Sequence, residues 1–297
     1  MFSAFWALQI FIAKLGFSAG ALVLPFQIAL FISAIVTLSV LLLPRSGADF
    51  FELLKNNSPL FWKLFFANAV QSGLGTSLSI IGVSLTSAIN AGFLVKLSTV
   101  TTSIFAWIIL KEQMSVKKVF VIFIALSGAY LITTKGQTLL PHIGDLFLLG
   151  ACFCWSLGNV YVRKFLKSQS VKADVVTIQK PLAGLPVLLV LVGGSFFYSP
   201  GLGKLSMVLA CCSLKPDILP YALGSGFFLA LAWVFLYRTL EVATASYMTL
   251  MSMVTPIFVS LLAVTILKES MVGIQVLGGG MILLSGVLGS SGDLFQK

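Results

Sequence analysis

Two stretches of the chain decide the fold: KLSTVTTSIFAWIILKEQ at residues 96–113 and MVTPIFVSLLAVTILKES at residues 253–270. They align without a gap, 157 residues apart, and six of the 18 aligned positions are identical, including the shared ending Ile-Leu-Lys-Glu. A second match lies upstream, because Trp6 and Trp155 are each followed eight residues later by a basic residue. The sequence therefore predicts two copies of one unit.

The composition indicates that both copies lie in a membrane. Of the 297 residues, 58% are hydrophobic and 9% charged, and the mean hydropathy is +1.05. A soluble domain has about 45–50% apolar and about 25% charged residues, so a soluble globule, a disordered chain and a fibrous repeat are excluded. A membrane-spanning helix needs about 20 apolar residues, so ten of them would use about 200 residues and leave only short loops.

Hydrophobic runs between prolines, glycines and charges predict ten transmembrane helices. The runs do not alternate as the strands of a membrane barrel would. Five helices in each copy is an odd number, so the second copy must enter the membrane from the opposite side. We therefore expect an all-α membrane protein made of two inverted five-helix repeats, at residues 1–134 and 143–290. The ten expected spans are 2–16, 21–43, 60–83, 87–110, 116–134, 143–162, 174–197, 218–239, 243–267 and 271–290.

The basic residues predict the orientation. A net charge of +10 would suggest nucleic acid as a partner of a soluble protein, but here the charges lie between hydrophobic runs and act as topology signals. With both termini in the cytoplasm, the cytoplasmic ends carry 12 Lys and Arg residues and the outer ends carry 5. We therefore expect the lipid bilayer and a small-molecule substrate as partners, and no nucleic acid.

Metal, cofactor and catalytic sites are not expected. The four cysteines and the single histidine, His142, lack the spacing of a metal site. An intramembrane protease would need a His-Glu-x-x-His helix or two membrane aspartates, and the spans contain neither. The sequence thus predicts a protein that is not an enzyme.

Lys96 is the sharpest candidate for a binding residue, because it falls near the middle of its span. A cation at that depth costs about 2.5–3.5 kcal/mol on insertion scales, and such residues usually face the bundle interior or a water-filled cavity. Lys96 either meets a carboxylate or another anionic group of a substrate, or bonds to helix carbonyls and locks the bundle. No acidic residue lies deep in a span, so Lys96 is also the candidate for proton coupling, with facilitated diffusion and exchange equally open.

Further polar and aromatic residues are predicted to bind substrate. The third span places Asn68, Gln71, Ser72, Gly75 and Ser79 at helical spacing, which suits either a hydrated cavity wall or hydrogen bonds between helices. Lys180 lies closer to the cytoplasm and is predicted to extend to the interface. Glu112 and Glu269 are predicted to be solvated charges that help to end their helices. The other candidate substrate-binding residues are Trp6, Trp155, Asn159, Trp233, Tyr237 and Ser252.

These features resemble the EamA family of the drug/metabolite transporter superfamily. The likeness rests on the two Trp-x7-Lys/Arg openings, the two Ile-Leu-Lys-Glu endings, and the glycine-rich fifth helix that follows each ending. The family's fourth-helix proline is present at Pro256, but its counterpart in the first half is Thr99. The resemblance implies ten helices, cytoplasmic termini, a central cavity and transport of small metabolites.

The resulting functional hypothesis is an exporter of amino acids or similar carboxylate-bearing compounds, working by alternating access in a bacterial inner membrane. Two alternatives stay open: a transporter of phosphorylated or nucleotide-linked metabolites, and a membrane assembly subunit that transports nothing.

Overall fold

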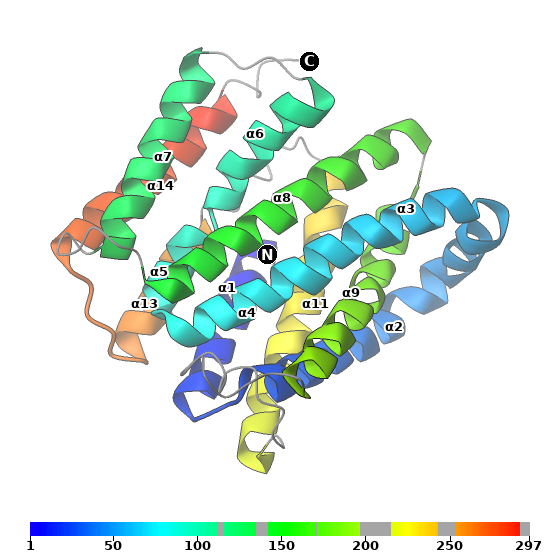
Figure 1. Ribbon diagram of the computed structural model, residues 1–297, viewed down its shortest axis with the longest axis horizontal. Coiled ribbons are helices and arrows are strands. Elements are labelled where there is room, and N and C mark those ends of the chain that lie inside the picture. The colour runs from blue at the N-terminus through cyan, green and yellow to red at the C-terminus, as the bar shows by residue number, and fades with distance from the viewer. Residues whose placement is uncertain (112–115, 135–141, 170, 197–214, 243–253, 292–297) are drawn as a thin grey trace.

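The described part of the molecule is entirely helical. The structure is a computed structural model that describes residues 1–111, 116–134, 142–169, 171–196, 215–242 and 254–291 (Figure 1). Within these ranges, six helical stretches are long and apolar enough to cross a membrane. They are Val23–Asn56, Ser58–Leu85, Ala88–Ile109, Ile143–Val162, Ala173–Leu191 and Pro216–Arg238, and four shorter apolar helices are Phe2–Ser18, Val119–Ile132, Thr255–Thr265 and Gly273–Leu288.

The helices follow the predicted order along the chain. In the first half they are α1 (Phe2–Ser18), α2 (Val23–Asn56), α3 (Ser58–Asn68), the π-helix η1 (Ala69–Gly75), α4 (Thr76–Leu85), α5 (Ala88–Leu94), α6 (Leu97–Leu110) and α7 (Val116–Thr134). In the second half they are α8 (Ile143–Gln169), α9 (Ala173–Phe196), the short 3₁₀ turn η3 (Pro216–Ile218), α11 (Leu219–Val242), α13 (Val254–Thr265) and α14 (Gly273–Ser291).

Four expected spans differ from the observed helices. The sixth, expected to end at residue 162, continues as α8 to Gln169. Helix α2 does not end near residue 43 but continues past Pro44 to Asn56, because its extension still buries Phe50. The third span is not one α-helix, since η1 interrupts it. The fourth span breaks between α5 and α6, at Val95 and Lys96.

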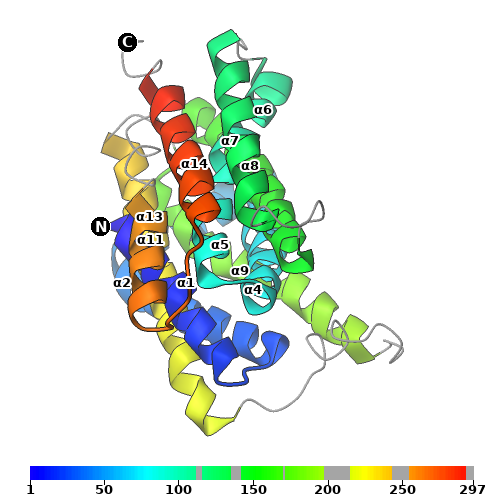
Figure 2. The same cartoon turned by 90° about the vertical axis from the view of Figure 1, so that its left-hand side faces the viewer.

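Helices from the two halves pack against each other throughout the bundle. Helix α1 packs against α11 and α13, while α8 packs against α4, η1 and α6. Helix α2 packs against α9. Helix α7 packs against α14, and these two helices lie side by side in both views (Figures 1 and 2). The core is therefore built between the halves.

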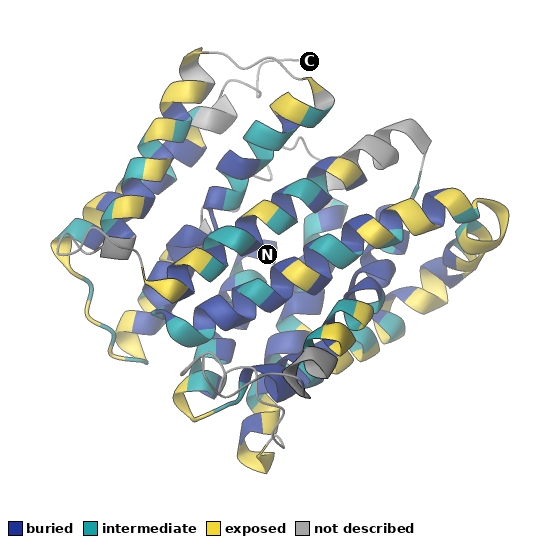
Figure 3. Cartoon of the chain, viewed as in Figure 1, coloured by how far each residue is buried: buried dark blue, intermediate teal, exposed yellow. Residues whose placement is uncertain are grey.

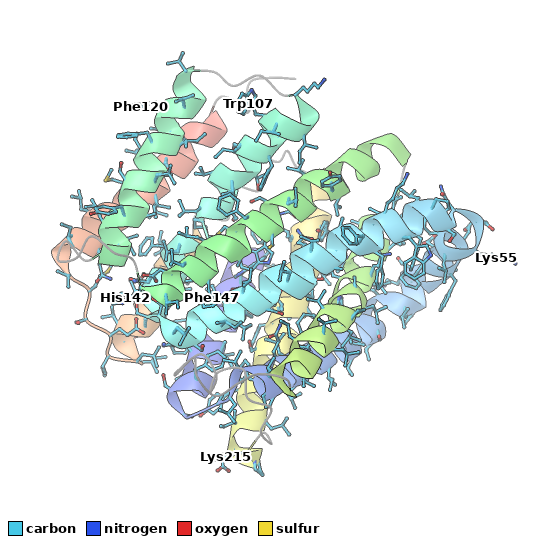
Figure 4. All side chains as sticks on the ribbon, in the orientation of Figure 1. Lys55, Trp107, Phe120, His142, Phe147 and Lys215 are labelled. Atoms are coloured by element: carbon cyan, nitrogen blue, oxygen red, sulfur yellow. The ribbon has the colours of Figure 1, made fainter. Side chains whose placement is uncertain are left out.

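The outward faces of the helices are apolar. Figure 3 shows buried residues on the faces that meet inside the bundle and exposed residues on the outer faces. Large apolar side chains lie on those outer faces, among them Trp107 of α6 and Phe120 of α7, which are 50% and 60% exposed (Figure 4). Such a surface would be costly in water but matches the hydrocarbon of a bilayer.

Glycines allow α7 and α14 to approach closely. A Cβ atom on Gly278 would lie only 2.6 Å from the Gly128 carbonyl oxygen, and one on Gly128 would lie equally close to the Gly278 carbonyl oxygen. A Cβ atom on Gly280, in the same helix, would meet no other described residue within 4 Å. The Gly-Gly-Gly run thus contains two packing glycines, Gly278 against Gly128 and Gly279 against the Phe93 ring, and one free position, Gly280.

We expect Gly278→Ala to destabilise the protein by about 1–3 kcal/mol, because the methyl group overpacks the α7–α14 contact. Gly280→Ala is the matched control and is expected to be neutral or to stabilise by about 0.5–1 kcal/mol, since alanine favours the helix. Thermal unfolding in detergent measures both. Equal midpoints for the two variants would contradict the observed packing.

Candidate functional site

Lys180 lies deep inside the bundle. Its side chain projects from α9 and is only 2% exposed. The ammonium Nζ donates a hydrogen bond of 2.5 Å to Gln71 Oε1, and it lies 5.3 Å from the Trp233 ring centroid and 5.0 Å from that of Tyr237. The prediction that Lys180 extends to the interface is wrong. The two aromatic faces and the amide oxygen hold its charge inside, through cation–π attraction and a charge-assisted hydrogen bond.

The Gln71 carboxamide links Lys180 to α8. Because an ammonium group only donates, the Gln71 atom that faces Lys180 must be the oxygen. Tyr237 Oη also donates to this oxygen, at 3.5 Å. The Gln71 amide Nε2 donates in the other direction, to Asn159 Oδ1 and to the Trp155 carbonyl oxygen. Three other predicted binding residues, Trp155, Asn159 and Tyr237, thus contact the Gln71 side chain.

Gln71 and Ser72 lie on the π-helix η1, which the sequence analysis did not anticipate. A π-helix is rare and often marks a functional site, because its extra residue turns side chains away from the regular helical register. Glycines fit η1 between its neighbours: a Cβ atom on Gly73 would lie 2.7 Å from Val187 Cγ2, and one on Gly75 would lie 2.7 Å from Trp155 Cδ1. The paired glycines are the only sequence signal we find for this tight segment.

The polar stripe of the third span makes hydrogen bonds between helices. Asn68 Nδ2 donates to Gln179 Oε1 at 3.0 Å, and Gln179 Nε2 donates to the Phe61 carbonyl oxygen at 3.0 Å. Ser72 Oγ donates to the Lys180 carbonyl oxygen at 2.5 Å. These contacts favour the second of the two predicted roles for Asn68 and Ser72, and they fix α9 and Lys180 against the third span.

Lys96 occupies the break between α5 and α6. It immediately precedes α6, and its side chain is 8% exposed. The Cys152 thiol of α8 donates to the Leu94 carbonyl oxygen at the same break, at 3.4 Å. Within the described ranges, no hydrogen bond or ion pair engages the Lys96 ammonium. The alternative in which it bonds to carbonyls and locks the bundle thus has no contact in its favour there.

One face of α8 connects the surroundings of the two lysines. Cys152, Trp155 and Asn159 are spaced by three and four residues and therefore share a face. Cys152 lies at the level of Lys96. Asn159 lies at the level of the Gln71–Lys180 pair, about 10 Å further along the helix at 1.5 Å per residue. Trp155 lies between these levels, with its ring centroid 5.8 Å from that of Trp6 in an edge-to-face pair.

The described acidic groups lie away from both lysines. Asp145, in the first turn of α8, accepts a hydrogen bond of 2.6 Å from Thr86 Oγ1. Asp174, in the first turn of α9, forms an ion pair with Arg238, at 3.6 Å. Among the residues that can be described, neither Lys96 nor Lys180 has a carboxylate partner, and no group of three or more potential metal ligands occurs.

Glu269 has a structural role that the sequence analysis missed. Its carboxylate accepts hydrogen bonds from the backbone N–H groups of Ala88, at 2.9 Å, and Ile89, at 3.2 Å, and so caps α5 of the other half. The preceding Lys268 has a left-handed φ of 56°, which turns the chain toward α5. The prediction of a merely solvated charge is therefore wrong: Glu269 is half-buried and joins the two halves.

A cavity of about 590 Å³ lies at this end of the bundle, which we call the Glu269 end. Lys14 reaches it from α1 and donates to the Thr86 carbonyl oxygen at 2.5 Å. His142, at the start of α8, also lines the cavity, and Figure 4 shows it far from Lys55, at the opposite end of the bundle. The other lining residues are Ser84, Leu85, Thr86, Ser87, Asn90, Leu267, Lys268, Glu269 and Ser270.

Comparison with known proteins decides the family. The model of the EamA-like transporter family matches residues 1–134 and 142–291. The chain belongs to the EamA-like transporter family. As the resemblance predicted, it is therefore an integral membrane protein related to transporters.

Relatives of this EamA-family protein are described as uncharacterized transporters. The chain is 36% identical over 96 residues to the uncharacterized transporter YyaM of Bacillus subtilis, a match that covers 31% of this chain and 32% of YyaM. It is 26% identical over 219 residues to an uncharacterized transporter of Methanothermobacter thermautotrophicus, covering 71% of this chain and 58% of the relative. These matches thus span about a third and somewhat over half of the two relatives.

The fold is shared with a protein of known structure. A solved crystal structure superimposes with a TM-score of 0.61 over 96% of this chain and 95% of the other, at 14% sequence identity. At that identity the likeness establishes the fold alone.

The predicted site residues of this EamA-family chain fall into three groups. Gln71, Ser72, Asn159, Trp155, Trp233 and Tyr237 gather around Lys180, with Trp6 against Trp155. Lys96 is buried at a separate level along α8. Ser252 lies outside the described residues.

We expect Glu269→Ala to speed hydrogen exchange at the Ala88 and Ile89 amides more than tenfold, because two hydrogen bonds to a charged acceptor, each worth about 1.5–3 kcal/mol, are lost. Glu269→Gln, which keeps one acceptor oxygen, should fall between wild type and alanine. The exposed Glu52→Ala serves as the control and should leave these amides unchanged. Unaltered exchange in Glu269→Ala would contradict the cap.

Proposed function

We propose that this protein carries small carboxylate-bearing solutes, such as amino acids, across the membrane, and that the solute carboxylate pairs with Lys180. The observation that carries the proposal is the buried Lys180 ammonium, which has one neutral hydrogen-bond acceptor and two aromatic rings around it. An anionic solute would supply the opposite charge that no described residue provides there.

The energetics favour an anion at this position. Burying an ion is costly unless it is paired and hydrogen-bonded. The amide oxygen of Gln71 and the rings offset part of that cost, and a carboxylate would offset more, because it adds the Coulombic attraction of opposite charges to the hydrogen bond. Lys96 adds a second cation along the path, at the level of Cys152.

The helix contacts support two inverted five-helix halves, at residues 1–134 and 143–290. The first helix of each half, α1 or α8, packs against the third and fourth helices of the other half. The second helices, α2 and α9, pack against each other, as do the fifth helices, α7 and α14. A two-fold relation between the halves would produce this reciprocity, and it brings the corresponding residues Trp6 and Trp155 into contact.

Alternating access follows naturally from such halves. Two similar units in opposite orientations can exchange conformations, which moves the opening from one face of the membrane to the other. We propose that the Glu269 end faces outward and that both termini lie in the cytoplasm of a bacterial cell, because the excess of Lys and Arg lies at the other end. Export is the direction that fits the family resemblance.

A second solute class is favoured by one specific observation. Phosphorylated or nucleotide-linked metabolites would need more than one cation in the interior. Lys180 is buried, contrary to the prediction from sequence, so two interior cations are present, separated by about 10 Å along α8. A solute with anionic groups at both ends would suit this spacing.

A panel of amino acids, dicarboxylates and sugar phosphates in proteoliposomes, with and without a pH gradient, tests the proposal. We expect Lys180→Gln to lower the uptake of the transported carboxylate by at least tenfold, since a charged hydrogen bond worth about 1.5–3 kcal/mol is lost. Lys55→Gln, at an exposed position, is the control. Full activity of folded Lys180→Gln would refute the assigned role, and absence of flux for every solute would favour an assembly subunit.

Lys96→Met distinguishes the two solute classes. If the solute meets both lysines, Lys96→Met should lower the uptake of a dianionic solute at least tenfold and leave a competing monocarboxylate within about threefold of wild type. Competition between the two solutes in the same vesicles provides the measurement. Equal losses for both solutes would indicate that Lys96 serves every transported anion.

A further inference from the structure

We propose that Gln71 is an internal substitute for the solute carboxylate: it occupies Lys180 in the empty protein, and an anionic solute displaces it. This inference rests on the proposed pairing of the solute with Lys180 and adds a residue that sets the preference for anions. The proposal names Gln71 as a specificity-determining residue whose amide oxygen and the solute oxygen compete for the same donors.

Two donors converge on the Gln71 amide oxygen. Lys180 Nζ donates at 2.5 Å and Tyr237 Oη at 3.5 Å, and both side chains are buried. An ammonium and a phenol that point at one oxygen form an arrangement that would equally bind an oxygen of a carboxylate. The amide oxygen thus marks the place where the solute anion would lie.

The other end of the Gln71 side chain has partners of its own. Nε2 donates to Asn159 Oδ1 and to the Trp155 carbonyl oxygen, both on α8. When the oxygen leaves Lys180, the amide nitrogen can therefore stay bonded to α8 and no buried donor is left without a partner. The displaced state is accessible for this reason.

Neutrality makes the substitute displaceable. A glutamate at this position would form a buried ion pair with Lys180, and breaking such a pair costs about 3–5 kcal/mol. An amide oxygen holds the ammonium more weakly than a carboxylate does, so an incoming anion can win the competition. A neutral solute gains no such advantage over the amide, which explains how the site would reject it.

The π-helix gives Gln71 a route of movement. The hydrogen bonds of a π-helix such as Ala69–Gly75 join residues five apart rather than four. A shift of these bonds by one position, to the α-helical pattern, would turn Gln71 about the helix axis. Gly158 of α8 lies so close that its Cβ position would be 2.6 Å from Gln71 Cβ. A glycine there lets α8 and η1 approach closely, which keeps Asn159 and the Trp155 carbonyl within reach of the Gln71 amide.

The test compares Gln71→Ala and Gln71→Glu by thermal unfolding in detergent with sodium benzoate, using neutral benzamide as the matched probe. In wild type, benzoate should raise the unfolding midpoint and benzamide should not. Gln71→Ala removes the competitor, so its apparent dissociation constant for benzoate should fall on the order of tenfold. Gln71→Glu supplies a permanent carboxylate and should abolish the benzoate shift, with Asn159 turning its amide to donate to the new oxygen.

Gln275→Ala is the control, because Gln275 is equally buried but bonds to Asn90 at the Glu269 end. It should lower the midpoint and keep the wild-type benzoate response. If Gln71→Ala does not fold, Gln71→Asn, whose shorter amide cannot reach Lys180, takes its place. The proposal is overturned if benzoate raises the unfolding midpoint of Gln71→Glu as much as that of wild type. It is also overturned if Gln71→Ala, or Gln71→Asn in its place, binds benzoate no more tightly than wild type. Such a result together with lost flux in Lys180→Gln leaves the transport function standing and removes only the role of Gln71.

Discussion

The structure depends on one constraint: an ammonium group, that of Lys180, is buried between helices where the described residues offer it no carboxylate. The Trp233 and Tyr237 rings and the Gln71 oxygen compensate part of its desolvation. Gln71 connects the ammonium to Asn159, while Ser72 bonds the Lys180 backbone carbonyl and Asn68 bonds Gln179, so the part of α9 that carries the ammonium is fixed against the third span. The site is thus both a stable core and an incomplete one, because no carboxylate of the described residues pairs with its charge.

The surrounding fold makes this arrangement geometrically feasible. The π-helix η1 turns Gln71 toward Lys180, and glycines at positions 73, 75 and 158 let three helices approach one another there. The opposite halves meet again at the Glu269 end, where a carboxylate from one half caps a helix of the other. The reciprocal helix contacts between the halves are what the proposed alternating access would require.

Much of the fold could be predicted from the sequence, because hydrophobic length and the repeated Ile-Leu-Lys-Glu ending depend only on local composition and order. The aromatic pair on α11 and the polar residues of the third span were also recognised, since helical spacing places them on one face. The burial of Lys180 could not be predicted, because the groups that compensate its charge come from two other segments of the chain, η1 and α11. The π-helix and the cap by Glu269 could not be predicted for the same reason, because tertiary contacts decide both. The local sequence of the third span is equally compatible with a straight α-helix, and that around Glu269 with a solvated charge.

The most direct test of this account is an experimental structure of the protein with its transported solute bound. The account predicts an anionic oxygen of the solute within about 3 Å of Lys180 Nζ, between the Trp233 and Tyr237 rings, with the Gln71 amide turned toward α8. A solute bound elsewhere while Gln71 still holds Lys180 would contradict it.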